Sequence, residues 1–166
     1  MKRKDTSERY QTFEDLEVYQ VAREFRKAMY RVANQLPDVE KFGLIGQIRR
    51  AALSLTNNIA EGHGRFHFLE QIKFMLQSRG SLEELMDDLN ACEDENYLPV
   101  PDIETLKQDA WRVHKLINGY IRFLRQRIAE HSSRVQESAE SDLDENEINE
   151  LFCGRFDPSS FQPFNG

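Results

Sequence analysis

The chain has 166 residues, which is long enough for one hydrophobic core with terminal extensions, and its formal net charge is −7. No stretch approaches the roughly 20 consecutive apolar residues that a membrane-spanning helix needs, and the polar N-terminus lacks the apolar segment of a secretion signal. Two cysteines, Cys92 and Cys153, stand far apart, so neither a disulfide framework nor a metal knuckle is indicated. We therefore expect a cytoplasmic protein with no membrane association.

The negative charge is concentrated near the C-terminus. Residues 132–166 carry a net charge of −6, so the preceding residues are nearly neutral. This last segment is polar and acidic, and its scattered phenylalanines follow no helical pattern. We predict a flexible N-terminus at residues 1–12, a folded domain at residues 13–131, and an acidic tail at residues 132–166 that is mostly disordered or docks on a partner.

Apolar residues recur at helical spacing through the first half of the folded domain. Thr12 and Asp15 have the form of a helix start, and the first helix is predicted over residues 13–36. After a short connection, a second helix is predicted from about residue 44 to Gly62. The sequence Gly62-His63-Gly64 then predicts a left-handed turn at the end of that helix, because glycine adopts this conformation readily.

The second half of the domain continues the same pattern. A third helix is predicted over residues 66–93, with Arg79 interrupting its apolar face and Gly80 indicating a bend or the close approach of another helix. The fourth helix has the most regular apolar stripe, from Ile103 to Ile128. Four amphipathic helices joined by short loops predict an all-α fold, an antiparallel up-down-up-down four-helix bundle.

A line of small and polar residues runs along the second helix beside its apolar face. Such residues are short for a solvent-exposed surface, where long charged side chains are favoured, and small side chains permit close helix packing. We interpret the line as a polar helix seam, either within the bundle or between subunits of an oligomer. Its candidate residues are Ala51, Ser54, Asn58 and Glu61.

Basic residues gather on the second and fourth helices, and the fourth has no acidic residue between Asp109 and Glu130. One interpretation is a phosphate-binding surface built from these two helices. The other is that these charges are neutralised by the acidic second half of the third helix, within the bundle or between subunits. The candidate nucleic-acid-binding residues are Arg49, Arg50, Arg65, Arg112, Lys115, Arg122 and Arg125.

The sequence offers little for catalysis or cofactors. His63, His67 and Glu70 have spacings that a metal site could use, but a bundle metal site normally draws Glu-x-x-His from two helices, and this chain has no such pair. No nucleophile motif, phosphate loop or dinucleotide fingerprint is present. We therefore expect no enzymatic activity, no catalytic residue, no metal and no cofactor.

Several motifs resemble a known family. These are Leu16-Glu-Val-Tyr19-Gln, Gln47-Ile-Arg49-Arg50-Ala51-Ala-x-Ser54, Asn58-Ile-Ala-Glu61-Gly62-x-Gly64-Arg65 and Gly80-Ser81-Leu82-x-Glu84-Leu85. Together they resemble the four-helix bundle proteins first noticed in intervening sequences of bacterial 23S ribosomal RNA genes. That family is similar to the accessory variability determinant of diversity-generating retroelements, a basic bundle that works with a reverse transcriptase and nucleic acid.

The resemblance implies a four-helix bundle that assembles as a homo-oligomer, a pentamer in the retroelement relatives, with no known catalytic residues. We therefore expect a non-enzymatic accessory or scaffold protein whose partner is RNA, DNA or a reverse-transcriptase-type protein. The nearly neutral body and the acidic tail of this chain differ from the strongly basic retroelement relatives. The alternative is thus a protein-interaction module that acts through its acidic, aromatic tail without binding nucleic acid.

Overall fold

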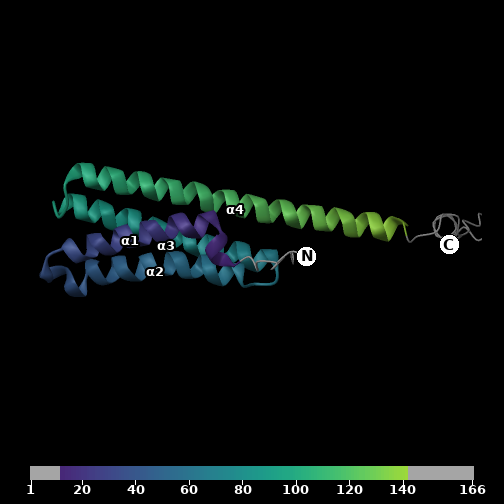
Figure 1. Cartoon of the computed structure of the whole chain (residues 1–166), viewed down its shortest axis with the longest axis horizontal. Coiled ribbons are helices and arrows are strands. Elements are labelled where there is room, and N and C mark those ends of the chain that lie inside the picture. The colour runs from purple at the N-terminus through teal and green to yellow at the C-terminus, as the bar shows by residue number, and fades with distance from the viewer. Residues whose placement is uncertain (1–11, 142–166) are drawn as a thin grey trace, which may run out of the picture. The chain divides into compact units, whose positions relative to one another are not determined.

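The computed structural model describes the backbone of residues 12–141 and the side chains of residues 12–134. Within this range the chain forms four α-helices and two short 3-10 helices and contains no strand, which confirms the all-α prediction (Figure 1). The α-helices are α1 (Glu17–Gln35), α2 (Leu44–His63), α3 (Phe68–Asp94) and α4 (Val100–Ser141). The 3-10 helices η1 (Phe13–Asp15) and η2 (Asp38–Phe42) precede α1 and α2.

Among the described residues the chain divides into two units between Arg127 and Ile128, and α4 crosses the boundary between them. This helix continues to Ser141, so the first residues of the predicted tail are helical. Residues 132–141 include Gln136, Glu137, Ala139 and Glu140, which are good helix formers and extend an existing helix without a new nucleation step. The rest of the predicted tail, with its phenylalanines, lies outside the described residues.

The core of the first unit consists of the apolar stripes of all four helices. Ile48, Leu55 and Ile59 of α2 are completely buried, as their spacing on one helix face predicts. Completely buried large side chains also come from the other helices and include Met29, Met75, Leu82, Leu89, Ile103 and Ile117. Burial of these side chains against one another, about 1.5–3 kcal/mol for each large apolar residue, holds the helices together as a bundle.

The end of α2 differs from the predicted left-handed turn. Gly64 has φ −74° and ψ −7°, and among the described glycines none has a positive φ angle. Gly62 lies within the last turn of α2 and is buried, and a Cβ atom added to it would lie 2.9 Å from Cβ of Phe74. The glycine is needed for close packing of α2 on α3, not for a turn. Gly80, in contrast, has open space around it.

The helices of the first unit are arranged so that α2 and α4 are not neighbours. Hydrogen bonds join α1 to α2, α2 to α3, and α3 to α4. In Figure 1, α1 and α3 lie between α2 and α4 within residues 12–127. The up-down-up-down order of the whole set stays a prediction. None of the described helices is both long enough and apolar enough to cross a membrane.

Candidate nucleic-acid interface

The predicted polar seam on α2 contacts α3 of the same chain. Ser81 of α3 donates a 2.8 Å hydrogen bond to the hydroxyl of Ser54, and Ala51 beside it is buried. One turn away along α3, Ser78 donates a 2.7 Å hydrogen bond to the backbone carbonyl of Leu55. Small side chains let the two helices approach closely, and the serine hydroxyls form hydrogen bonds within the contact.

The other two seam candidates interact within or just beyond α2. Asn58 donates its amide hydrogen atoms to the backbone carbonyl and the hydroxyl of Ser54, at 2.9 and 3.1 Å. Glu61 is exposed and forms an ion pair with Arg65. Asn58 therefore orients the serine that contacts α3, whereas Glu61 lies outside the contact.

A buried carboxyl group continues this seam. Asp88 of α3 is 2% exposed and accepts a 2.6 Å hydrogen bond from the side-chain amide of Gln47 on α2. Burial raises the pKa of Asp88 to about 6, and the Gln47 hydrogen bond opposes this shift. The adjacent acidic residues Asp87 and Glu84 raise the pKa further, and the charge of Arg50 lowers it.

The three candidate arginines at α2 are associated with other residues of the chain. Arg49 donates a 2.6 Å hydrogen bond to Asn34 of α1, and Arg50 acts electrostatically on Asp88. Arg65 pairs with Glu61, and its guanidinium lies 4.7 Å from the ring centroid of Phe74. The interpretation that the acidic half of α3 neutralises these charges therefore fits Arg50 in part, whereas Arg65 is paired with Glu61 of α2.

The four basic candidates on α4 have different surroundings. Each is exposed, and among the described residues none of the four forms a hydrogen bond or an ion pair. These residues are Arg112, Lys115, Arg122 and Arg125. In Figure 1, α1 and α3 lie between α2 and α4 within residues 12–127, so the two predicted basic groups belong to helices that are not side by side.

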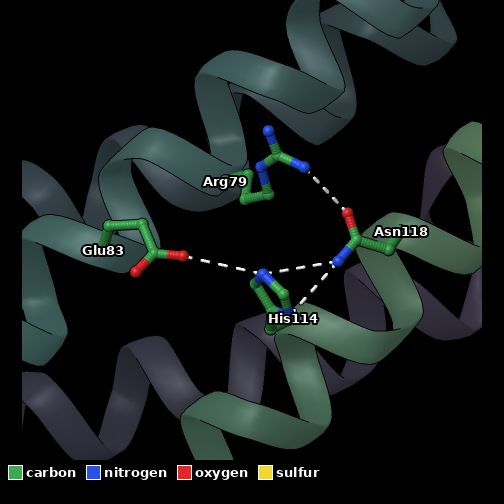
Figure 2. A network of polar contacts seen from close by, with 4 residues as sticks. All are labelled: Arg79, Glu83, His114 and Asn118. Carbon is green, nitrogen blue, oxygen red and sulfur yellow. Dashed lines mark hydrogen bonds and ion pairs between the residues drawn. The ribbon is translucent and has the colours of Figure 1, made fainter.

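A polar network joins α4 to α3 beside these basic residues (Figure 2). Arg79 of α3 donates a 3.0 Å hydrogen bond to the side-chain oxygen of Asn118 on α4. The amide nitrogen of Asn118 lies 3.2 Å from Nδ1 of His114, whose Nε2 lies 3.6 Å from a carboxylate oxygen of Glu83. The contacts pair residues in opposite order along the two helices, so α3 and α4 are antiparallel here.

The network marks the border between a basic and an acidic part of this face. Residues 71–82 of α3 and 110–129 of α4 contain no acidic side chain. Arg122 and Arg125 follow Asn118 by four and seven residues, which places them on the same side of α4. From Glu83 of the network onward, α3 is acidic, with Glu84 and Asp87 following. We call Arg79, Asn118, Arg122 and Arg125 the α3–α4 basic face.

Two residues of this region were not among the candidates from the sequence. Arg79 was recognised only as an interruption of an apolar stripe, although an arginine at such a position is itself a signal, because a charged group there needs a polar partner. Trp111 is 51% exposed and lies directly before Arg112. In the sequence, Trp111 could have been recognised as a candidate because it stands beside a basic residue in a segment without acidic side chains.

The histidines considered for a metal site do not lie together with other potential ligands. His63 is at the end of α2, and His67 precedes α3 with its ring against that of Phe66. Among the described residues, no group of three or more histidine, cysteine, aspartate or glutamate side chains is placed to hold a metal ion.

Comparison with known proteins identifies the family. The model of the 23S rRNA-intervening sequence protein family matches residues 14–119, from η1 to the middle of α4. No curated protein matches the chain. The matched region includes α2 and α3, which form the polar seam, and the four residues of the network in Figure 2. It covers more than half of the sequence. The chain belongs to the 23S rRNA-intervening sequence protein family.

Proposed function

We propose that this protein is a non-enzymatic, homo-oligomeric scaffold that binds nucleic acid through the α3–α4 basic face. The observation that carries the proposal is the pair of antiparallel segments, residues 71–82 and 110–127, that bear basic side chains and no acidic ones. The backbone of nucleic acid carries a negative charge at every phosphate, and lysine and arginine side chains that contact it release bound counterions. A surface of this kind attracts the backbone without reading its sequence.

The availability of the side chains also supports this choice of surface. Arg122 and Arg125 are exposed and have no partner among the described residues, so a phosphate group displaces no intramolecular ion pair when it binds them. The guanidinium of Arg79 is already oriented by Asn118. Arginine donates two parallel hydrogen bonds to a phosphate, which gives it an advantage over lysine at such contacts.

The homo-oligomeric part of the proposal is supported by exposed apolar side chains on α2 and α3. Leu53 is 43% exposed, Leu69 71% and Leu76 38%. Leu69 and Leu76 lie seven residues apart on one side of α3, and apolar side chains grouped on a surface commonly mark protein contacts. The pentamer, the kinship with the retroelement determinant and the role of the acidic tail with a reverse transcriptase or another protein partner stay predictions.

The binding proposal is tested with the full chain and a fluorescently labelled RNA oligonucleotide, by anisotropy over a series of salt concentrations. Affinity should fall steeply as salt rises, because counterions must be released. The double substitution Arg122→Ala and Arg125→Ala should weaken binding and reduce the slope of log affinity against log salt by about 1.5 to 2.

A matched control removes two positive charges elsewhere. Arg23 of α1 and Lys41 in η2 are exposed, and Arg23→Ala with Lys41→Ala gives the same change in net charge. This control should leave the slope nearly unchanged. Equal effects of the two double variants would show that net charge matters and the α3–α4 basic face does not. Absence of RNA and DNA binding by the wild-type chain at low salt would refute the proposal.

A further inference from the structure

The single tryptophan of the chain is exposed on the same helix as the free basic residues. Trp111 has 51% of its surface exposed, although large aromatic residues are usually mostly buried. Its ring contacts His114 edge to face, with 5.3 Å between the ring centroids and 80° between the planes. This exposed aromatic surface therefore has a defined neighbour that limits how the indole ring is oriented.

The neighbour is itself held in place by the network in Figure 2. His114 is close to Asn118 on one side and to Glu83 on the other, and Asn118 accepts a hydrogen bond from Arg79. The polar contacts thus run from α3 across to His114, which lies against Trp111. An aromatic side chain supported in this way loses less conformational entropy when a ligand stacks on it.

Basic side chains follow the tryptophan along α4. Lys115 follows Trp111 by four residues and Arg122 follows it by eleven, so the three share one side of the helix. A helix rises about 1.5 Å per residue, so they extend over roughly 16 Å of the helix axis. An aromatic ring followed by cations at this spacing matches a strand whose phosphates and unpaired bases are both accessible.

We propose that the nucleic acid bound by this face is single-stranded and that one of its bases stacks on Trp111. This inference rests on the proposed function and names the class of nucleic acid. Bases in a duplex are stacked on each other and are not available to a flat surface side chain, whereas every unpaired base offers a π face. The carboxylate of Glu83 lies beside His114, and because α3 and α4 are antiparallel, the acidic residues of α3 lie on the same side of the network as Trp111.

The experiment uses the wild-type full chain with an RNA oligonucleotide of about 16 nucleotides, alone or annealed to its complement. Because the chain has one tryptophan, its fluorescence reports on Trp111 alone. The single strand should quench this fluorescence and the duplex should not. Trp111→Ala should weaken single-strand binding roughly 5- to 100-fold and change duplex binding less than about 2-fold, while Trp111→Phe restores part of the affinity.

Phe123 provides the matched control. It is also an exposed aromatic residue of α4, at 52%, but it lines a groove with Leu16 and Val18 near the start of α1. Phe123→Ala should leave single-strand affinity within about 2-fold of wild type. Salt-dependent binding without quenching, and unaffected by Trp111→Ala, would overturn the stacking inference and leave the proposed function intact. No binding of either RNA form at low salt would overturn both.

Discussion

Gln47 and Asp88 join α2 to α3 through a 2.6 Å hydrogen bond between the amide nitrogen of Gln47 and Oδ1 of Asp88. The other carboxyl oxygen, Oδ2, is buried and has no hydrogen-bond partner among the described residues. A buried carboxylate with one unsatisfied oxygen disfavours its charged form, which accounts for the pKa of about 6. The stability of the α2–α3 seam should therefore depend on pH.

We expect the protonated form of Asp88 to be the stabilising one. The pKa of this carboxyl is 3.8 when unperturbed and about 6 in the folded chain, so the folded state binds the proton more tightly. The contribution to stability is fully present below the unfolded value and is lost as the pH rises through about 6. The loss amounts to up to about 3 kcal/mol in the free energy of unfolding.

The substitution Asp88→Asn should remove this dependence, because the amide stays neutral and its oxygen can still accept the hydrogen bond from Gln47. Urea unfolding of both chains at several pH values between 4 and 8 gives the difference in their free energies of unfolding. The free energy of unfolding of the Asp88→Asn variant should rise relative to that of the wild-type chain as the pH rises. Asp94→Asn is the control, since Asp94 is exposed on the same helix, and a constant difference for Asp88→Asn would contradict the assigned pKa.

Gly62 and Gly80 should respond oppositely to alanine. At Gly62 the new methyl group would lie 2.9 Å from Cβ of Phe74 and 3.3 Å from Cε of Met75, so α2 and α3 must move apart. We expect a net loss of about 1–2 kcal/mol in the free energy of unfolding, because overpacking outweighs the higher helix propensity of alanine.

Gly80→Ala is the matched variant, since it makes the same chemical change in a helix where the new methyl group meets nothing within 4 Å. It should raise the free energy of unfolding by about 0.5–1 kcal/mol. Urea denaturation followed by circular dichroism measures both variants. Equal effects in the same direction would show that helix propensity, and not packing at Gly62, decides the result.

Cys92 should be unreactive in the folded protein. The residue is completely buried, and burial, with smaller effects from Asp88 and Glu40, raises the pKa of its thiol to about 11. The thiolate that reacts with disulfide reagents is then roughly 100-fold scarcer than at the ordinary pKa of 9.0.

The measurement is labelling with an aromatic disulfide reagent in a Cys153→Ser background, so that Cys92 supplies the thiol that is labelled. The native chain should react more slowly than the urea-unfolded chain by roughly 100-fold or more. Asn57→Cys, at an exposed position of α2, serves as the reactive control in the same background. Rapid native labelling of Cys92 would mean that the α2–α3 contact opens readily.

The helices of this fold could be predicted from the sequence because each one carries its own pattern of apolar residues at helical spacing. The steps of three and four among Ile48, Leu55 and Ile59 identify a buried helix face without knowledge of its neighbours. The pairing of Arg65 with Glu61 is equally local, since residues four apart lie side by side on a helix. Patterns within one helix are therefore sufficient for its position and its buried side.

The candidate site was less predictable because it depends on how two helices are aligned. Arg79 and Asn118 are separated by 39 positions, and a shift of one turn between α3 and α4 would give Arg79 a different partner. The role of Gly62 was missed for the same reason, since a glycine near a helix end fits a turn as well as a close contact. Such contacts are decided by packing between helices.

The hydrogen bond between Arg79 and Asn118 should stabilise the pairing of α3 with α4. A double-mutant cycle with Arg79→Met, Asn118→Ala and the combined variant isolates the interaction, and we expect a coupling free energy of about 1 kcal/mol in urea unfolding. Both residues are partly buried, so solvent screens the bond incompletely. The exposed ion pair of Lys27 with Glu24 offers a comparison cycle, with an expected coupling clearly smaller than that of Arg79 with Asn118. Additive effects of Arg79→Met and Asn118→Ala would show that the network of Figure 2 does not hold the two helices in register, and that the support it gives to His114 and Trp111 is correspondingly weak.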